Sequence, residues 1–96
     1  MVTTDEPGIY IEGSHGIRTE NELVCRELVN NEYGQFMGFE TITCCPIDLD
    51  AVLPEQMTAK QRAWLNEYHA FVRESLLERM GSDEEREWLR QATRAI

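Results

Sequence analysis

Residues 9–20 read Ile9-Tyr10-Ile11-Glu12-Gly13-Ser14-His15-Gly16-Ile17-Arg18-Thr19-Glu20. The stretch begins with a short β-branched and aromatic run and continues into a turn with a glycine at each end of its tip. Side chains then alternate in character over residues 17–29, which is the pattern of a strand. The stretch therefore predicts an antiparallel hairpin, with residues 9–11 in one strand and residues 17–29 in the next.

The pattern continues on the C-terminal side of the hairpin. Residues 30–34 form a second predicted turn, and residues 36–45 form a third predicted strand, which Pro46 ends. Three strands joined by turns predict an antiparallel meander. On the N-terminal side, residues 1–8 are polar and turn-prone, and nothing in them resembles a signal peptide.

Two helices are predicted after a connector over residues 46–57. Thr58 opens the first helix in a capping box with Gln61, and Gly81 ends it. A second capping box over residues 82–85 opens a shorter helix. The first helix carries an apolar stripe that is expected to be core or interface: Trp64, Leu65, Tyr68, Phe71, Val72 and Leu76. The shorter helix is expected to bury Trp88, Leu89, Ala92 and Ile96.

The composition suits one small globular domain or a piece of a larger one, with 96 residues, of which 42% are hydrophobic and 28% charged. The net charge of −9 argues against nucleic acid and anionic membranes as partners, because both attract basic surfaces. No apolar run approaches the roughly 20 residues of a membrane span. Cys25, Cys44 and Cys45 are odd in number and lack metal-site spacing, so buried free thiols in a reducing cytosol are predicted.

Two carboxylates stand out by their context. Glu6 precedes Pro7 just ahead of the first strand, and Glu20 lies across the hairpin turn. If the strands pair around that turn, both carboxylates project onto one side of the sheet, where Arg18 joins them. Converging carboxylates repel, and a hard divalent ion such as manganese or magnesium holds them better than a guanidinium does. With 18 acidic residues in the chain, solvated surface carboxylates are the alternative interpretation.

The sequence contains no other arrangement that predicts chemistry. It has no Ser-His-Asp or Cys-His grouping and no phosphate-binding glycine loop. His15 falls in the predicted hairpin turn, and His69 falls on the first helix. A surface or locally hydrogen-bonded role is predicted for each.

Residues 4–13 (TDEPGIYIEG) and 16–21 (GIRTEN) resemble the end of the catalytic domain of Xaa-Pro aminopeptidases, which are pita-bread metallopeptidases like prolidase and methionine aminopeptidase. Residues 38–48 (GFETITCCPID) resemble the segment that closes this domain. Residues 64–69 (WLNEYH) and the Trp88-Leu89 pair resemble the C-terminal helical extension of longer members. The resemblance implies an α+β chain, with residues 1–48 ending a pita-bread domain and residues 49–96 forming the helical extension.

The resemblance also implies roles for single residues. Glu6 and Glu20 match two of the five metal ligands of the family. The glutamate at Glu6 also shuttles a proton during the hydrolytic attack, the one at Glu20 bridges two metals, and the arginine at Arg18 orients ligand carboxylates. The other ligands, two aspartates and a histidine, come earlier in the family and have no match here. Four further residues match no ligand position: His15, Asp48, Asp50 and His69.

The resemblance implies a fragment of a cytoplasmic aminopeptidase that releases an N-terminal residue preceding proline. Its cofactors would be two divalent ions, expected to be manganese, and its partners would be peptides with proline at the second position. A homo-oligomer is expected, and the fragment alone is expected to be inactive. Three alternatives remain: a metal-free pita-bread interaction module, an assembly role for the first helix, and a prolidase-type dipeptidase, against which the helical extension argues.

Overall fold

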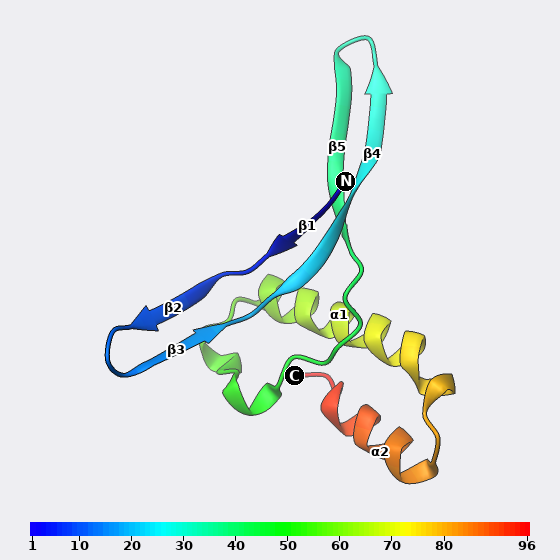
Figure 1. The fold of residues 1–96 in the computed structure, drawn as a ribbon. Coiled ribbons are helices and arrows are strands. Elements are labelled where there is room, and N and C mark those ends of the chain that lie inside the picture. The colour runs from blue at the N-terminus through cyan, green and yellow to red at the C-terminus, as the bar shows by residue number, and fades with distance from the viewer. The chain divides into compact units, whose positions relative to one another are not determined.

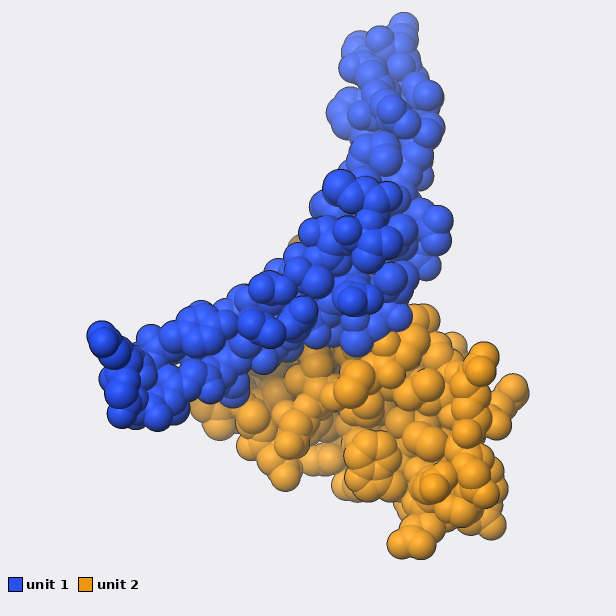
Figure 2. Space-filling view, viewed as in Figure 1, with its two compact units in different colours: residues 1–43 blue, residues 44–96 orange.

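The computed structural model describes all 96 residues, and the predicted α+β fold with antiparallel strands is confirmed. The chain divides into two compact units, residues 1–43 and residues 44–96 (Figures 1 and 2). The strands are β1 (Val2–Asp5), β2 (Gly8–Ile11), β3 (His15–Arg18), β4 (Asn21–Asn31) and β5 (Gly34–Thr41). The helices are α1 (Ala59–Leu76), α2 (Asp83–Ala92) and three short 3-10 helices, Leu49–Ala51, Pro54–Gln56 and Leu77–Arg79. The expected domain division after residue 48 stays a prediction.

The first unit contains one long antiparallel ladder with an interruption. β1 pairs with β4, and β2 pairs with β3. Counting on from the Asp5–Asn21 pair reaches the Gly8–Arg18 pair without an insertion on either strand, so both pairings share one register. The break falls at Pro7, which has no N–H to donate. Thr19 N–H donates to the Pro7 carbonyl at 3.1 Å and spans the gap.

Two predicted strand boundaries were wrong at this ladder. The predicted strand over residues 17–29 is two strands, because Thr19 and Glu20 lie in the interruption. Residues 1–8, predicted to be polar and turn-prone, contain β1. β1 forms because β4 offers it a full set of backbone partners, and Cys25 N–H extends the pairing to the Met1 carbonyl at 2.9 Å. Val2, Thr3 and Thr4 are also β-branched and favour a strand, so the local composition agrees with this pairing.

The third predicted strand, β5, is shorter than predicted, and its partner β4 contains a bulge. β5 ends at Thr41, because Glu22 N–H then donates to the Thr43 hydroxyl at 2.7 Å instead of to a backbone carbonyl. The register between β4 and β5 shifts at Leu28, which is the extra residue of a β-bulge. Leu28 lies against Gly38, where an added Cβ would be 2.6 Å from Leu28 Cδ1.

The first unit has no buried residue, and Figure 2 shows it as a narrow strip of side chains. Its exposed large side chains include Ile9, Ile17, Phe36 and Phe39. A sheet without a covering layer has no core of its own, and a two-stranded hairpin alone is marginally stable. All the fully buried residues of the chain lie in the second unit: His69, Val72, Leu89 and Thr93.

In the second unit, α1 begins with the predicted capping box. Thr58 Oγ1 accepts from Gln61 N–H at 3.1 Å, and Gln61 Oε1 accepts from Thr58 N–H at 2.9 Å. The helix ends earlier than predicted, at Leu76, and a 3-10 turn follows before Gly81. No helix of the structure is long and apolar enough to cross a membrane.

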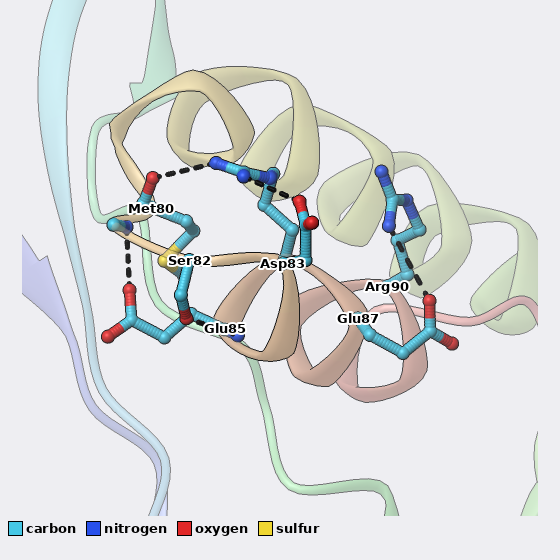
Figure 3. A network of polar contacts seen from close by, with 8 residues as sticks. Met80, Ser82, Asp83, Glu85, Glu87 and Arg90 are labelled. Atoms are coloured by element: carbon cyan, nitrogen blue, oxygen red, sulfur yellow. Dashed lines mark hydrogen bonds and ion pairs between the residues drawn. The ribbon is translucent and has the colours of Figure 1, made fainter.

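The second capping box is only half formed (Figure 3). Ser82 Oγ accepts from Glu85 N–H at 3.2 Å, as predicted, but the Glu85 carboxylate accepts from Gly81 N–H at 2.6 Å rather than from Ser82. The carboxylate thus satisfies the amide one position earlier. Arg86 adds two bonds at this corner, to the Met80 carbonyl at 3.0 Å and to Asp83 at 2.7 Å.

The two helices form a small core that differs from the predicted one. Val72 of α1 and Leu89 of α2 are buried as expected, but Trp64 and Trp88 are 57% and 60% exposed. Leu89 and Thr93 stand four residues apart and face inward together, which turns the neighbouring Trp88 outward. The remaining stripe residues are half-buried or exposed: Leu65, Tyr68, Phe71, Leu76, Ala92 and Ile96.

Candidate metal-binding site

Glu6 and Glu20 lie at the interruption of the ladder. Counting on by one position from the Asp5–Asn21 pair places Glu6 opposite Glu20. Residues at opposite positions of an antiparallel pair project to the same face. The structure therefore brings the two predicted carboxylates together on one face.

Each carboxylate is held by a residue two positions away on its own strand. Thr4 Oγ1 donates to Glu6 Oε2 at 2.7 Å. Arg18 Nη2 donates to Glu20 Oε2 at 2.7 Å, so the predicted pairing of Arg18 with Glu20 is present. The side chains of this ion pair are 48% and 38% exposed, and water screens such pairs. The arginine therefore orients Glu20 more than it stabilises the fold.

Tyr10 is a further member of this site, and sequence reasoning missed it. An added Cβ would be 2.8 Å from Tyr10 Oη at Gly8 and 2.9 Å from Tyr10 Cδ1 at Gly16, so the phenol ring lies across both glycines. Its hydroxyl hydrogen-bonds with Arg18, which is the main cause of the raised pKa of the guanidinium, followed by the charge of Glu20. The available signal was the register: Tyr10 is paired with Gly16, and an aromatic ring can cover a cross-strand glycine.

The donor set fits part of a metal shell. Two opposed carboxylates supply hard oxygen atoms, which suit manganese or magnesium. In each carboxylate the hydrogen bond from the neighbouring side chain engages Oε2. The structure contains no group of three or more histidine, cysteine, aspartate or glutamate side chains placed to hold an ion. Glu6 and Glu20 therefore offer two carboxylates on one face, which is fewer donors than a complete metal shell needs.

The remaining candidates lie elsewhere. His15 is exposed beside the hairpin turn, with Nδ1 2.8 Å from Ser14 Oγ. The surface role allowed for His69 was wrong, because its ring is fully buried in the second unit. Asp48 Oδ1 accepts from Asp50 N–H at 2.9 Å and begins a 3-10 helix. The three cysteines form no disulfide, but their predicted burial was wrong, because Cys25 and Cys44 are half-buried and Cys45 is exposed.

The hollows of the surface do not coincide with the carboxylates. A shallow one of about 340 Å³ is lined by Pro7, Gly8, Ile9, Ile17 and Thr19. All but one of these residues alternate with the site residues along the strands, so the hollow lies on the other face of the ladder. A larger hollow of about 540 Å³ lies in the second unit, between residues 45–50 and α2.

An antiparallel sheet unit followed by a two-helix unit defines an α+β chain with a candidate carboxylate metal site. The family described as the C-terminal region of peptidase M24 matches residues 35–96, and the chain belongs to this family.

Relatives extend the match over the whole chain. A probable Xaa-Pro aminopeptidase P of Coprinopsis cinerea is 33% identical over 100 residues, covering 100% of this chain and 16% of that protein. Aminopeptidase P1 of Lotus japonicus is 36% identical over 104 residues, covering 100% of this chain and 15% of that protein. The predicted resemblance is confirmed, and the chain spans about one sixth of the length of these relatives.

A solved structure supports the fold. The crystal structure of X-prolyl aminopeptidase from Caenorhabditis elegans matches with a TM-score of 0.82 and 33% identity, covering 99% of this chain and 16% of that one. That protein is described as a cytosolic enzyme with a di-nuclear active site. The expected fold, the C-terminal part of a pita-bread domain with a helical extension, is confirmed by this match.

Proposed function

We propose that this chain is the C-terminal part of a metal-dependent aminopeptidase that releases an N-terminal residue preceding proline. The observation that carries the proposal is the register that sets Glu6 opposite Glu20 on one face of the ladder. The relatives, which are named Xaa-Pro aminopeptidases, and the di-nuclear site of the solved neighbour support it. The peptides that this enzyme would cleave carry proline at the second position.

Glu6 and Glu20 would supply two of the ligands of a two-metal site. Two divalent ions, expected to be manganese, would polarise the scissile carbonyl and activate the attacking water. Glu6, which the Thr4 hydroxyl orients through Oε2, would take the proton from the water and return it to the leaving proline nitrogen. Arg18, held by Tyr10, would keep Glu20 in its ligating orientation.

The 96 residues alone would not catalyse this reaction. Two carboxylates bind a divalent ion weakly, because an incomplete shell loses most of the chelate advantage. The two aspartates and the histidine of the family would come from the rest of a longer protein. We place that protein in the cytoplasm by its similarity to the cytosolic neighbour.

A chimera tests this function. The matching C-terminal segment of the Caenorhabditis elegans enzyme is replaced by this chain, and hydrolysis of a tripeptide with proline at the second position is followed. We expect activity that Glu6→Gln and Glu20→Gln each reduce by at least 100-fold, as expected for ligand loss. Glu12→Gln, in the hairpin turn, is the matched control and should retain activity. A folded chimera that is inactive with both glutamates intact would contradict the proposal.

Activity of the chimera on dipeptides only would instead favour the prolidase-type alternative.

An assembly role for α1, and with it the homo-oligomer, is favoured by one observation. Trp64 is more than half exposed, with Lys60 Nζ 4.9 Å from its ring centroid, and Phe71 on the same helix is also exposed. Loss of self-association in Trp64→Glu would support this role. If the chimera binds no metal, the result would favour the third alternative, a metal-free interaction module.

A further inference from the structure

Two consecutive residues of α1 bind the main chain of residues 45–47, which have no regular secondary structure. Tyr68 Oη donates to the Cys45 carbonyl at 2.8 Å and accepts from Cys45 N–H at 3.4 Å. Ile47 N–H donates to His69 Nε2 at 3.0 Å. These side chains take the place of a neighbouring strand, since they satisfy backbone groups that no ladder satisfies.

The bond from Ile47 fixes the protonation state of His69. A ring nitrogen that accepts a hydrogen bond carries no proton, so the imidazole is neutral and its proton lies on Nδ1. The ring is fully buried, and Nδ1 has no hydrogen-bond partner. A second proton would turn Nε2 into a donor that faces the Ile47 N–H, and it would also place a charge in the core. Only the neutral ring is compatible with this packing.

We propose that His69 is a pH-sensitive latch, which holds residues 45–47 on α1 while its imidazole is neutral and releases them when the ring is protonated. Ile47 loses its acceptor on protonation, whereas the bonds between Tyr68 and Cys45 do not depend on this proton. The latch lies wholly within the second unit and does not depend on the proposed metal site.

The surroundings of the ring favour the neutral form. Burial lowers the pKa of His69 from its usual 6.5, and the charge of Arg73 one turn along α1 lowers it further. Arg73 is held beside the ring, because Nη1 donates to the Thr93 carbonyl at 2.9 Å and to its hydroxyl at 3.3 Å. Besides Arg73, the titratable and charged groups of α1, of α2, of residues 44–50 and of the C-terminal residues are Cys44, Cys45, Asp48, Asp50, Lys60, Arg62, Glu67, Tyr68, Glu74, Asp83, Glu84, Glu85, Arg86, Glu87, Arg90 and Arg94. None of these is a cause of the shift in the pKa of His69.

The direction of the pH effect follows from proton linkage. The released state has the ordinary pKa of about 6.5 and binds a proton more readily than the latched state, so the latch is stable above this pH and weakens below it. Between pH 7 and pH 5 the population of the released state can rise at most about 25-fold through this one group. Carboxylates also titrate in this range, so the effect must be measured against a variant that lacks the histidine.

Amide hydrogen exchange at Ile47 tests the latch in the 96-residue chain. After correction for intrinsic exchange, we expect protection at Ile47 to fall between pH 7 and pH 5 by several-fold and by no more than about 25-fold. In His69→Gln the amide oxygen can accept the same bond but does not titrate, so protection should not fall in this way. His15→Gln removes the exposed histidine and should behave like the wild type. An equal fall in His69→Gln, or no fall in the wild type, would overturn the proposal.

The wild-type protein provides a second readout if His69→Gln does not fold. With ¹⁵N-labelled histidine, the chemical shifts of the ring nitrogens report the tautomer and the charge of His69. We expect the Nδ1–H tautomer at pH 7, and loss of Ile47 protection in step with protonation of the ring. A proton on Nε2 at pH 7, or a charged ring that coexists with a fully protected Ile47 amide, would contradict the latch.

Discussion

Glu6 and Glu20 occupy opposite positions of one antiparallel ladder, at the point where its hydrogen bonding is interrupted. Pro7 causes the interruption, because it cannot donate to the opposite strand. Thr19 N–H keeps the two strands together by donating to the Pro7 carbonyl at 3.1 Å. The proline and the two glutamates thus belong to one structural feature. Pro7 interrupts the ladder, and Glu6 and Glu20 face each other at this interruption.

Removing the guanidinium should weaken metal binding at these carboxylates. Arg18→Met leaves Glu20 without the partner that orients it, and we expect the apparent dissociation constant for manganese to rise about 10-fold or more. Paramagnetic broadening of the Glu20 resonances measures this constant. Arg26→Met is the control, because Arg26 makes an ion pair of similar length, 2.8 Å, with Glu40, although that pair is more exposed. If both variants weakened manganese binding equally, the loss of net positive charge would explain the effect, and the orienting role of Arg18 would be contradicted.

The Tyr10 hydroxyl should act through Arg18. In Tyr10→Phe the ring still covers Gly8 and Gly16, but the guanidinium loses its hydrogen-bond partner. We expect faster motion of the Arg18 side chain in ¹⁵N relaxation, with no measurable change in melting temperature. Tyr33→Phe, in the turn between β4 and β5, leaves Arg18 untouched and serves as the control. An Arg18 side chain that is equally mobile in wild type and Tyr10→Phe would contradict this role.

The cap of α1 should contribute measurably to stability. Thr58→Ala removes the hydroxyl that accepts from Gln61 N–H, and losing such a cap costs about 1 kcal/mol. Urea unfolding followed by circular dichroism at 222 nm measures the difference. Thr58→Ser keeps the hydroxyl and should restore most of the stability. Equal free energies of unfolding for the alanine and serine variants would show that the hydroxyl cap does not contribute to stability.

The exposed apolar side chains should cause self-association. The first unit buries no residue and exposes Ile9, Ile17, Phe36 and Phe39, and large exposed apolar surfaces favour aggregation. We expect the average mass from light scattering to rise with protein concentration. A monomer at every concentration would count against this expectation.

Much of this fold could be predicted from local patterns. The hairpin turn, the antiparallel pairing and the Thr58 cap each depend on a few neighbouring residues, and all are present. β1 was missed, because residues 2–5 pair with β4, about twenty residues later, and local patterns do not specify that pairing. The burial of His69 and the exposure of Trp88 were missed for a similar reason. They depend on how the two helices and residues 45–47 pack, which helical periodicity alone does not specify.

The candidate site was predictable in its carboxylates and not in its support. Glu6, Arg18 and Glu20 follow from the hairpin and from a family resemblance. Tyr10 required the register, because its role depends on the glycines beside it and across from it. The family match shows where the chain belongs, whereas the metal-binding roles of the glutamates are still a proposal.

Calorimetric titration with manganese tests the central claim most directly. The wild-type chain is compared with Glu6→Ala/Glu20→Ala and with Glu12→Ala/Glu32→Ala. Glu12 and Glu32 lie in the two turns, and replacing them removes the same amount of charge. We expect binding with a dissociation constant on the order of millimolar in the wild type and in the turn variant, as for a weak and incomplete oxygen site. This binding should vanish in Glu6→Ala/Glu20→Ala. Identical titrations of all three proteins would contradict the assignment of Glu6 and Glu20 as a metal half-site.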